Sequence, residues 1–581
     1  MSFFFLDRTY LTFDIIRRIL RDYFAYDVMF VMNITDIDDK IIMRSNERNV
    51  GFTELAREYE NEFWYDMERL GIQEPDVVTR ISEFIPECVE FIQRIIDAGY
   101  AYSSNGSVYF DVQKYQESPD HTYGKLVPEN VGDPSATEEG EGALSSNAGQ
   151  TDKRNQCDFA LWKASKEGEP SWESPWGPGR PGWHIECSVM ASDSLRDFTG
   201  DGTMDIHSGG IDLRFPHHDN EIAQSEACLE CQQWVNYFLH AGHLHIEGQK
   251  MAKSLKNFIR INDALERFTA GQIRLLFLGK KYNAPMEYSE NAMSGAVEEE
   301  KKFREFFNNV KAFIRENSHK ERLMKWGENE KDLMQSIMSA KRNVRTALLD
   351  DFDTPEVLRI LRNLISKVNR YMVETSPPVT NVVRSAAEYV TYMFRIFGLI
   401  DPIPAIGYSL GQGGLNTEDT VAPYMNTFTD FRSQVRFHAS QGDSIEILDL
   451  CDKVRDEHLP ELGVRLEDGA LGEPAKWKLE DPEVLRRERE EKQRVQKEKE
   501  EKKKAQQEAE RKRQEEIEAR KKIPPSEYFK RMKDEEENPL YTQFDEHGIP
   551  THDKDGNSLA KSAYKKLKKE HQKQEKLYNN Q

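Results

Sequence analysis

The chain has 581 residues and a mass of 67.5 kDa, so we expect about three to five packed units rather than one core. Hydrophobic residues make up 38% of it, which excludes a wholly disordered protein. Six cysteines cannot form a disulfide framework, and this predicts a reducing compartment. The apolar start, Met1 to Leu6, stops at Asp7, so we predict neither a cleavable leader nor membrane insertion.

The formal net charge of −22 is unevenly distributed along the chain. Residues 481–522 carry a net +3 and residues 523–581 are balanced, so residues 1–480 carry −25. Indiscriminate nucleic-acid binding needs a broad basic face, and an acidic body argues against it. Selective binding through a local basic surface stays open.

The N-terminal part of the sequence mixes helices and strands. Apolar residues recur at helical spacing over 52–70 and over 89–96, and each run is followed by a glycine. Residues 101–110 place an Asn-Gly turn among β-formers, which is typical of a hairpin. Apolar residues nearly vanish over 131–156, so a solvated loop is predicted to separate two structured regions.

The remaining chain is mostly helical in pattern. Residues 290–400 predict a helical bundle, and a smaller helical segment is expected to run to about residue 478. Residues 481–522 hold 29 charged residues and no sustained apolar seam. This favours a solvated single helix over a coiled coil.

Three residues of different ligand types could share a metal ion. His217 and Glu221 stand four residues apart after Pro216, which suits the first turn of a helix, so they are expected on one helical face. With a thiolate from the distant Cys187 they would suit zinc and leave a fourth position open. By spacing alone, an ordinary surface pair of His217 and Glu221 is an equal alternative.

A zinc finger is the competing metal prediction. It would use Cys228 and Cys231 with His240, His243 and His245. The eight residues between Cys231 and His240 are fewer than fingers usually have, and residues 222–234 are predicted as one continuous helix. The finger is therefore disfavoured.

Two further segments could contact a nucleotide. A short strand over 204–206 precedes Gly209, Gly210 and Asp212, where glycines admit a close ligand and the carboxylate can bond ribose hydroxyls. A plain glycine turn is the alternative. Lys250 and Lys253 lie in a loop-like stretch and could neutralise phosphate charge, although an ordinary basic loop has the same composition.

Taken in order, several segments resemble the signatures of cysteinyl-tRNA synthetases. They are Asn33 to Lys40, Gly182 to Cys187, Gly209-Gly210-x-Asp212, Pro216 to Glu221, and Lys250 to Ser254, where Ala252 replaces the usual serine. Lys522 to Ser526, Phe544 to Pro550 and the final lysine-rich segment resemble the eukaryotic cytosolic type. The resemblance covers nearly the whole chain.

The resemblance implies an α/β fold. It is a class I synthetase Rossmann-type core without its first strand, with an insertion, followed by a helical bundle, a small anticodon-binding region and a charged helical tail. The implied domains are a remnant of the first Rossmann half (1–40), an insertion with a disordered loop at 131–156 (41–180), the second Rossmann half and signature loop (181–289), a helical tRNA-contacting domain (290–405), the anticodon-binding region (406–480) and a charged extension (481–581).

The resemblance also implies an activity, namely ATP-dependent activation of L-cysteine and its transfer to tRNA(Cys) in the cytoplasm. Zinc would take the substrate thiolate, a bond that a serine hydroxyl does not match. Its matching ligands are Cys187, His217 and Glu221, while the family's remaining cysteine has no counterpart here, so weak zinc retention is expected. ATP would enter with Mg²⁺. The implied roles are catalytic for Lys250 and Lys253, ATP-binding for Lys253, Gly209, Gly210 and Asp212, and substrate-binding for Trp183 and Thr35.

One departure from the family pattern motivates an alternative. Residues 3–7 read Phe-Phe-Phe-Leu-Asp where the family has a His-x-Gly-His segment that binds ATP phosphates. The alternative is a catalytically inactive tRNA-binding or scaffolding protein, and a cysteine ligase acting on an amino sugar is a third reading. Further candidate partners are a second copy of the chain or synthetase-associated proteins at the C-terminal extension. Lysines within 481–522 and 561–576 are predicted to assist tRNA capture, with a solubilising spacer as the alternative.

Overall fold

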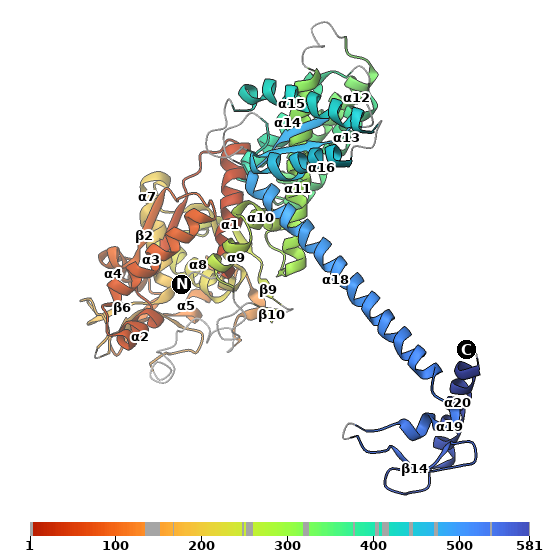
Figure 1. Ribbon diagram of the computed structural model, residues 1–581. Helices are drawn as coiled ribbons and strands as arrows, with labels where there is room; N and C mark the ends of the chain where they lie inside the picture. The colour runs from red at the N-terminus through yellow and green to blue at the C-terminus, as the bar shows by residue number, and fades with distance from the viewer. Residues whose placement is uncertain are drawn as a thin grey trace. The chain divides into compact units, whose positions relative to one another are not determined.

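The structure is a computed structural model of the chain, and it falls into two compact units (Figure 1). Unit 1 comprises residues 1–428 with Lys476–Leu479, and unit 2 comprises Thr429–Ala475 with residues 480–581. In the described part of the chain, no helix is long and apolar enough to cross a membrane. The described residues are 4–133, 152–166, 168–246, 249–250, 259–317, 325–375, 378–400, 406–408, 417–440, 445–469, 475–534 and 537–579.

Unit 1 begins with two parallel strand pairs and the helices against them. Strand β1 (Val31–Ile34) pairs with β2 (Val77–Arg80), and β7 (Met204–Gly210) pairs with β8 (Val235–Ala241). Helix α7 contacts β1, β2 and β7, so it lies against both pairs. The helices of this part are α1 (Phe4–Arg18), α2 (Asp39–Arg48), α3 (Phe52–Arg69), α7 (Trp183–Thr199) and α8 (Asp219–Leu229).

A four-stranded antiparallel sheet lies between these pairs in sequence. Its order is β3 (Ala101–Ser104), β4 (Ser107–Phe110), β5 (Phe159–Ala164) and β6 (Gly179–Pro181), beside α4 (Ile85–Asp97) and α5 (Val112–Gln116). The predicted hairpin is confirmed as β3–β4, with Asn105 and Gly106 at positive φ in its turn. Of the predicted loop 131–156, residues 134–151 lie outside the described residues. Its ends are anchored, because Val131 packs on this core and Asn105 donates a 2.5 Å hydrogen bond to Asp152.

The C-terminal part of unit 1 is the predicted helical bundle. The helices of the bundle lie side by side in Figure 1 and share one buried core. Asp14 joins α1 to this region through a fully buried ion pair with Arg274 of α10, at 2.5 Å. The elements are β9 (Leu244–Ile246), β10 (Gln249–Lys250), α9 (Ile261–Arg267), α10 (Ala270–Leu278), β11 (Met286–Tyr288), α11 (Glu290–Asn317), α12 (Glu328–Leu349), α13 (Thr354–Glu374) and α14 (Thr380–Ile396).

The segment after the bundle is not purely helical as predicted. It contains β12 (Val464–Glu467) and β13 (Lys476–Leu479) besides α15 (Thr417–Ser440), α16 (Ile445–Lys453) and α17 (Leu459–Glu461). The missed strands are only four residues long, too short for an alternating pattern to stand out.

Unit 2 ends in a long helix and a small folded module. Helix α18 (Pro482–Lys521) is the predicted single helix of 40 residues. The module comprises α19 (Pro525–Tyr528), the hairpin β14 (Tyr541–Phe544) and β15 (Pro550–Asp553), and α20 (Lys561–Asn579), around buried Phe529 and Ile549. Gln574 of α20 donates hydrogen bonds to the carbonyls of Arg520 and Ile523, so α20 is fastened to the end of α18.

Candidate metal site

Cys187 lies on helix α7, and the start of this helix is held against strand β5 through Gly182. Gly182 caps the helix and donates a 2.8 Å hydrogen bond to the Leu161 carbonyl of β5. A side chain there would collide with the Ala160 carbonyl oxygen, so only glycine fits at this close approach. Trp183 and Cys187 then follow four residues apart, on one face of α7.

Helix α8 is buried along nearly its whole length. All ten residues from Asp219 to Cys228 are buried, and the segment around residue 125 holds the polar groups of its first two residues. Asp219 accepts backbone hydrogen bonds from Leu126 and Val127, and Asn220 accepts one from the Tyr123 hydroxyl at 2.6 Å. Because α8 is enclosed in this way, the side chains at its N-terminal end, including Glu221, have fixed positions.

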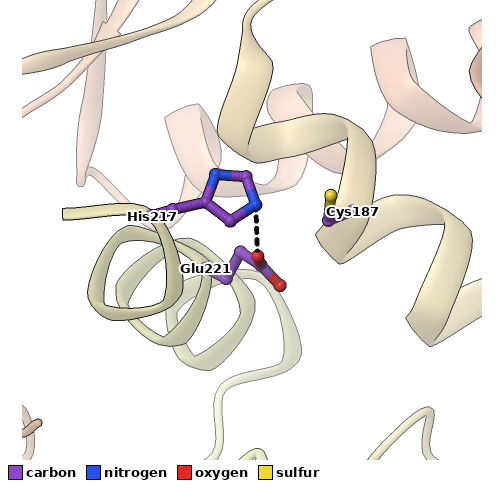
Figure 2. Close-up of side chains that lie close together, drawn as sticks. All are labelled: Cys187, His217 and Glu221. Atoms are coloured by element: carbon purple, nitrogen blue, oxygen red, sulfur yellow. Dashed lines mark ion pairs between the residues drawn. The ribbon is translucent and has the colours of Figure 1, made fainter. Parts of the chain in front are cut away.

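The predicted residues Cys187, His217 and Glu221 come together in the structure (Figure 2). One ligand atom from each lies within 4.8 Å of the other two. His217 lies in a short turn, Arg214–His218, that leads into α8, and its Nε2 lies 2.7 Å from Oε1 of Glu221. The surface-pair alternative is excluded, because His217 is 3% exposed and Glu221 is fully buried.

Neighbouring side chains orient this group. His184 Nδ1 lies 2.8 Å from His217 Nδ1, so one nitrogen of the two must carry the proton. Burial lowers the pKa of His184 well below its usual value and keeps that ring neutral. When His217 donates its Nδ1 proton to His184, its Nε2 is unprotonated and can bind a metal ion, whereas without an ion a protonated Nε2 donates to Glu221.

Glu221 is ionised even though it is buried. Burial alone would raise its pKa, but the imidazoles of His207 and His217 outweigh this and hold the pKa of Glu221 well below its usual range. Its Oε2 lies 2.8 Å from His207 Nε2. Its Oε1 lies 2.7 Å from His217 Nε2, so each carboxylate oxygen faces one imidazole nitrogen.

Cys187 completes the group with a soft donor. Burial raises the pKa of its thiol well above the usual value, as do the Glu221 and Glu186 carboxylates. Asn33 Nδ2 donates to its Sγ at 3.4 Å, a contact that favours the thiolate. A sulfur, a nitrogen and a carboxylate oxygen fit a divalent ion of zinc's character.

A second group of possible metal ligands shares Glu221. It consists of His207, His218 and Glu221, whose ligand atoms also lie within 4.8 Å of one another. His207 and His217 contact the Glu221 carboxylate, and His218 Nδ1 lies 2.9 Å from Nε2 of His240, a residue of β8. Burial lowers the pKa of His240 to about 4.

Sequence reasoning assigned no role beside the cluster to His184, His207, His218 or Asn33, and it considered His240 only for the zinc finger. Half of the protein's 14 histidines lie between residues 184 and 245, a concentration that could have pointed to them. Among the described residues, neither metal-capable group contains Cys228 or Cys231, and Cys228 is buried in α8, which ends at Leu229 rather than near residue 234.

The residues predicted to contact a nucleotide are placed by the structure as follows, and at Gly209 and Gly210 it excludes the alternative of a plain turn. Gly209 and Gly210 are not a turn, because they are the last residues of strand β7. A side chain on Gly209 would approach the His218 ring to 2.9 Å, so packing against that ring explains the glycine. Asp212 is exposed just beyond, the backbone of Lys250 lies in β10, and Lys253 lies outside the described residues.

The two residues predicted to contact the substrate are Trp183, which lies against His217, and Thr35, which lies close in sequence to Asn33. The Trp183 ring lies 4.3 Å from the His217 ring, centre to centre, and so covers one side of a candidate ligand. Thr35 follows directly after β1, two residues beyond Asn33.

Residues 5–298 match the family described as the catalytic domain of class I (C) tRNA synthetases. Over its length the chain is 47% identical to the cytoplasmic cysteine–tRNA ligase of Dictyostelium discoideum, covering 99% of this chain and 85% of that protein. It is 43% identical to the Homo sapiens protein of the same name, covering 98% and 89%. The chain belongs to the cysteine–tRNA ligase family.

Solved structures support the fold of this family member. The methionyl-tRNA synthetase of Mycobacterium tuberculosis, in complex with methionyl-adenylate, superposes with a TM-score of 0.52 over 67% of this chain and 88% of its own. The two sequences are 15% identical, so the likeness concerns the fold alone. The predicted class I α/β architecture is therefore confirmed.

Proposed function

We propose that this family member is a cytoplasmic cysteine–tRNA ligase. It uses ATP to activate L-cysteine and then transfers the cysteinyl group to tRNA(Cys). The observation that carries the proposal is the buried cluster of Cys187, His217 and Glu221 in a chain 43–47% identical to relatives with that name. Nothing in the cluster favours the inactive alternative, since each of the three side chains retains its donor atom.

The same cluster is proposed to hold zinc. When bound, zinc supplies a soft ligand position for the substrate thiolate, which distinguishes cysteine from serine by chemistry rather than by size. With the ion bound, His184 would accept the Nδ1 proton of His217 and so leave Nε2 available, while His207 contacts the second oxygen of Glu221. Trp183 covers the imidazole and shields this place from water.

The remaining roles follow the family pattern. Thr35 and Trp183 are proposed to contact the substrate, and Gly209, Gly210 and Asp212 to lie along ATP. Lys250 and Lys253 are proposed to stabilise the phosphate charge that develops as the adenylate forms. Residues 290–405 and 406–480 are proposed to contact the body and the anticodon of the tRNA. The other domain boundaries and a homodimer stay proposals in the same way.

Cysteine-dependent exchange of pyrophosphate into ATP tests this function. We expect exchange with cysteine, none with serine, and a loss of at least about 100-fold for Cys187→Ser, because the hydroxyl is a poor zinc ligand. In that variant the KM for cysteine should change far more than the KM for ATP. Cys231→Ser is the matched control, since Cys231 lies outside both metal-capable groups.

Two results would contradict the proposal. Absence of exchange in the unmodified chain, with tRNA binding retained, would favour the scaffolding alternative. Equal loss in Cys187→Ser and Cys231→Ser would mean that Cys187 is a structural residue.

A further inference from the structure

Five aromatic side chains gather where α1 ends beside α14. We call them the aromatic patch: Tyr23, Phe24, Tyr26, Tyr389 and Tyr392. Ring centres lie 5.0 Å apart for Tyr23 and Phe24, 6.4 Å for Tyr23 and Tyr392, and 6.5 Å for the stacked Tyr389 and Tyr392. Tyr26 is 61% exposed and Tyr392 is 39% exposed, so two rings of the patch face solvent.

Two cations of α12 lie over this patch. Lys341 Nζ is 5.3 Å from the ring centre of Tyr389, and the Arg345 guanidinium is 5.5 Å from that of Phe24. Both side chains are exposed, and neither has a carboxylate partner in the part of the chain that the structure describes. Asp22, beside Tyr23, is engaged by Arg21 through hydrogen bonds of 2.6 and 2.9 Å. Two exposed cations therefore lie against the rings, and two exposed carboxylates, Asp27 and Glu388, each stand one residue from a patch tyrosine.

The hydroxyl of Tyr389 is an independent sign of a missing ligand. Tyr389 is 7% exposed, and its hydroxyl has no hydrogen-bond partner among the described residues. Buried hydroxyls are nearly always paired in folded proteins, so an unpaired one calls for an explanation. The ring that carries it lies beside Lys341 and Tyr392.

We propose that the aromatic patch, with Lys341 and Arg345, binds an unstacked nucleotide of the tRNA. The base stacks on an exposed tyrosine ring and the adjoining phosphates contact the two cations. This assignment rests on the proposed function, which supplies an RNA substrate. Aromatic rings beside cations are the usual means of holding unpaired nucleotides. A protein interface fits less well, since lysine is depleted at the centres of such interfaces.

The charge of the surrounding body strengthens the argument. Residues 1–480 carry a net −25, which repels an RNA backbone over most of the surface. Residues 340–346 of α12 contain Lys341, Arg342 and Arg345 and no acidic residue. An RNA approaching this acidic body would be retained where such cations lie beside stacking surfaces.

Charge reversal on the patch is the first test. The double variant Lys341→Glu with Arg345→Glu is compared with Lys367→Glu with Arg370→Glu, which makes the same charge change at exposed positions of α13. We expect the patch variant to raise the Kd for a tRNA(Cys) transcript by about tenfold and to make its salt dependence shallower. Pyrophosphate exchange with cysteine should be unchanged in both variants. Equal Kd values for the two variants would overturn the proposal.

Cross-linking at the patch is the second test. A photoreactive phenylalanine analogue in place of Tyr26 should cross-link to the transcript, and the same analogue in place of Tyr237, an exposed tyrosine of β8, should not. A cross-link only to protein, or to a second copy of this chain, would overturn the RNA assignment. Binding and cross-linking are measured without turnover. Failure of pyrophosphate exchange would therefore count against the proposed function alone. The cross-linking result would still test the RNA assignment.

Discussion

Helices α8 and α18 both carry many ionisable groups, but those of α8 are buried and those of α18 are mostly exposed to solvent. In α8 the Glu226 carboxylate is buried and held by the Tyr115 hydroxyl and the Lys125 ammonium group. In α18 the ion pair of Arg494 and Glu491 has both side chains more than half exposed. A carboxylate withdrawn from water needs specific partners, whereas an exposed one is solvated wherever it lies. Chemistry is therefore expected to concentrate at α8, and substitutions there should have the larger effects.

The largest effect is expected for Glu221→Gln. An amide cannot replace a carboxylate between two imidazoles, so the metal should be lost and cysteine activation should fall by about 100-fold or more. Metal analysis of the purified protein and cysteine-dependent pyrophosphate exchange measure the two losses. Glu226→Gln on the same helix is the matched control. It should retain metal and exchange while lowering stability by about 1–3 kcal/mol, because its hydrogen-bond donors lose a charged acceptor. Retention of metal by Glu221→Gln would remove that residue from the ligand set.

The buried histidines predict a loss of stability in acid. The pKa of His240 is lowered by burial to about 4 from the ordinary 6.5. Between these values the unfolded chain binds a proton that the folded chain does not, so stability falls as the pH drops from 6.5 to 4, by about 3 kcal/mol at most. The carboxylate of Glu221 contributes a separate loss only below the ordinary pKa of glutamate, since its own pKa is lowered.

Replacement of His240 isolates that effect. Denaturant unfolding of the protein and of His240→Gln, each at pH 7 and pH 4.5, should show a smaller acid loss in the variant. An equal loss in both proteins would mean that His240 stays accessible to protons in the folded chain.

The sequence predicted those parts of the site that depend on local spacing. His217 and Glu221 meet because residues four apart share a helical face, and this holds wherever the helix packs. His184, His207 and His240 come from three different elements, so only the packing of α7, β7 and β8 brings them near. The plain glycine turn, the alternative given for Gly209, is excluded because β7 runs on to Gly210. The histidine ring that requires a glycine there is nine residues away in sequence.

A backbone prediction tests how tightly α7 is fixed. Gly182→Ala places a methyl group against the Ala160 carbonyl, so we expect a loss of about 1–3 kcal/mol in unfolding free energy. It should also weaken cysteine activation, because Trp183 and Cys187 shift with the helix. Gly295→Ala on α11 is the control. Nothing lies within 4 Å of its new methyl group, so it should stabilise the chain by about 0.5–1 kcal/mol. Equal behaviour of the two variants would mean that the N-terminus of α7 tolerates displacement.

The smallest effect is expected where charge is exposed. Truncation after Arg494 keeps buried Leu485 and the ion pair of Arg465 with Glu488, so the start of α18 should remain folded. It removes α20, whose seven lysines are exposed and face only two glutamates on the same helix. Cysteine activation should be unchanged. The affinity for tRNA should fall by about three- to tenfold at low salt, with a shallower salt dependence, because phosphate contacts are lost.

Charge reversal within the full chain separates the lysines from the length of the tail. Lys565→Glu, Lys566→Glu and Lys569→Glu on α20 should reproduce most of the truncation's effect, since α20 is fastened to α18 through Gln574 and presents these lysines as one surface. The control reverses Lys497 and Lys499 on α18, which lie among glutamates of opposite charge and should matter less. If neither the truncation nor the reversal changes the tRNA affinity or its salt slope, the extension acts as a spacer. The exposed charges of the extension would then contribute only to solvation, unlike the buried charged groups of α8, which have specific partners.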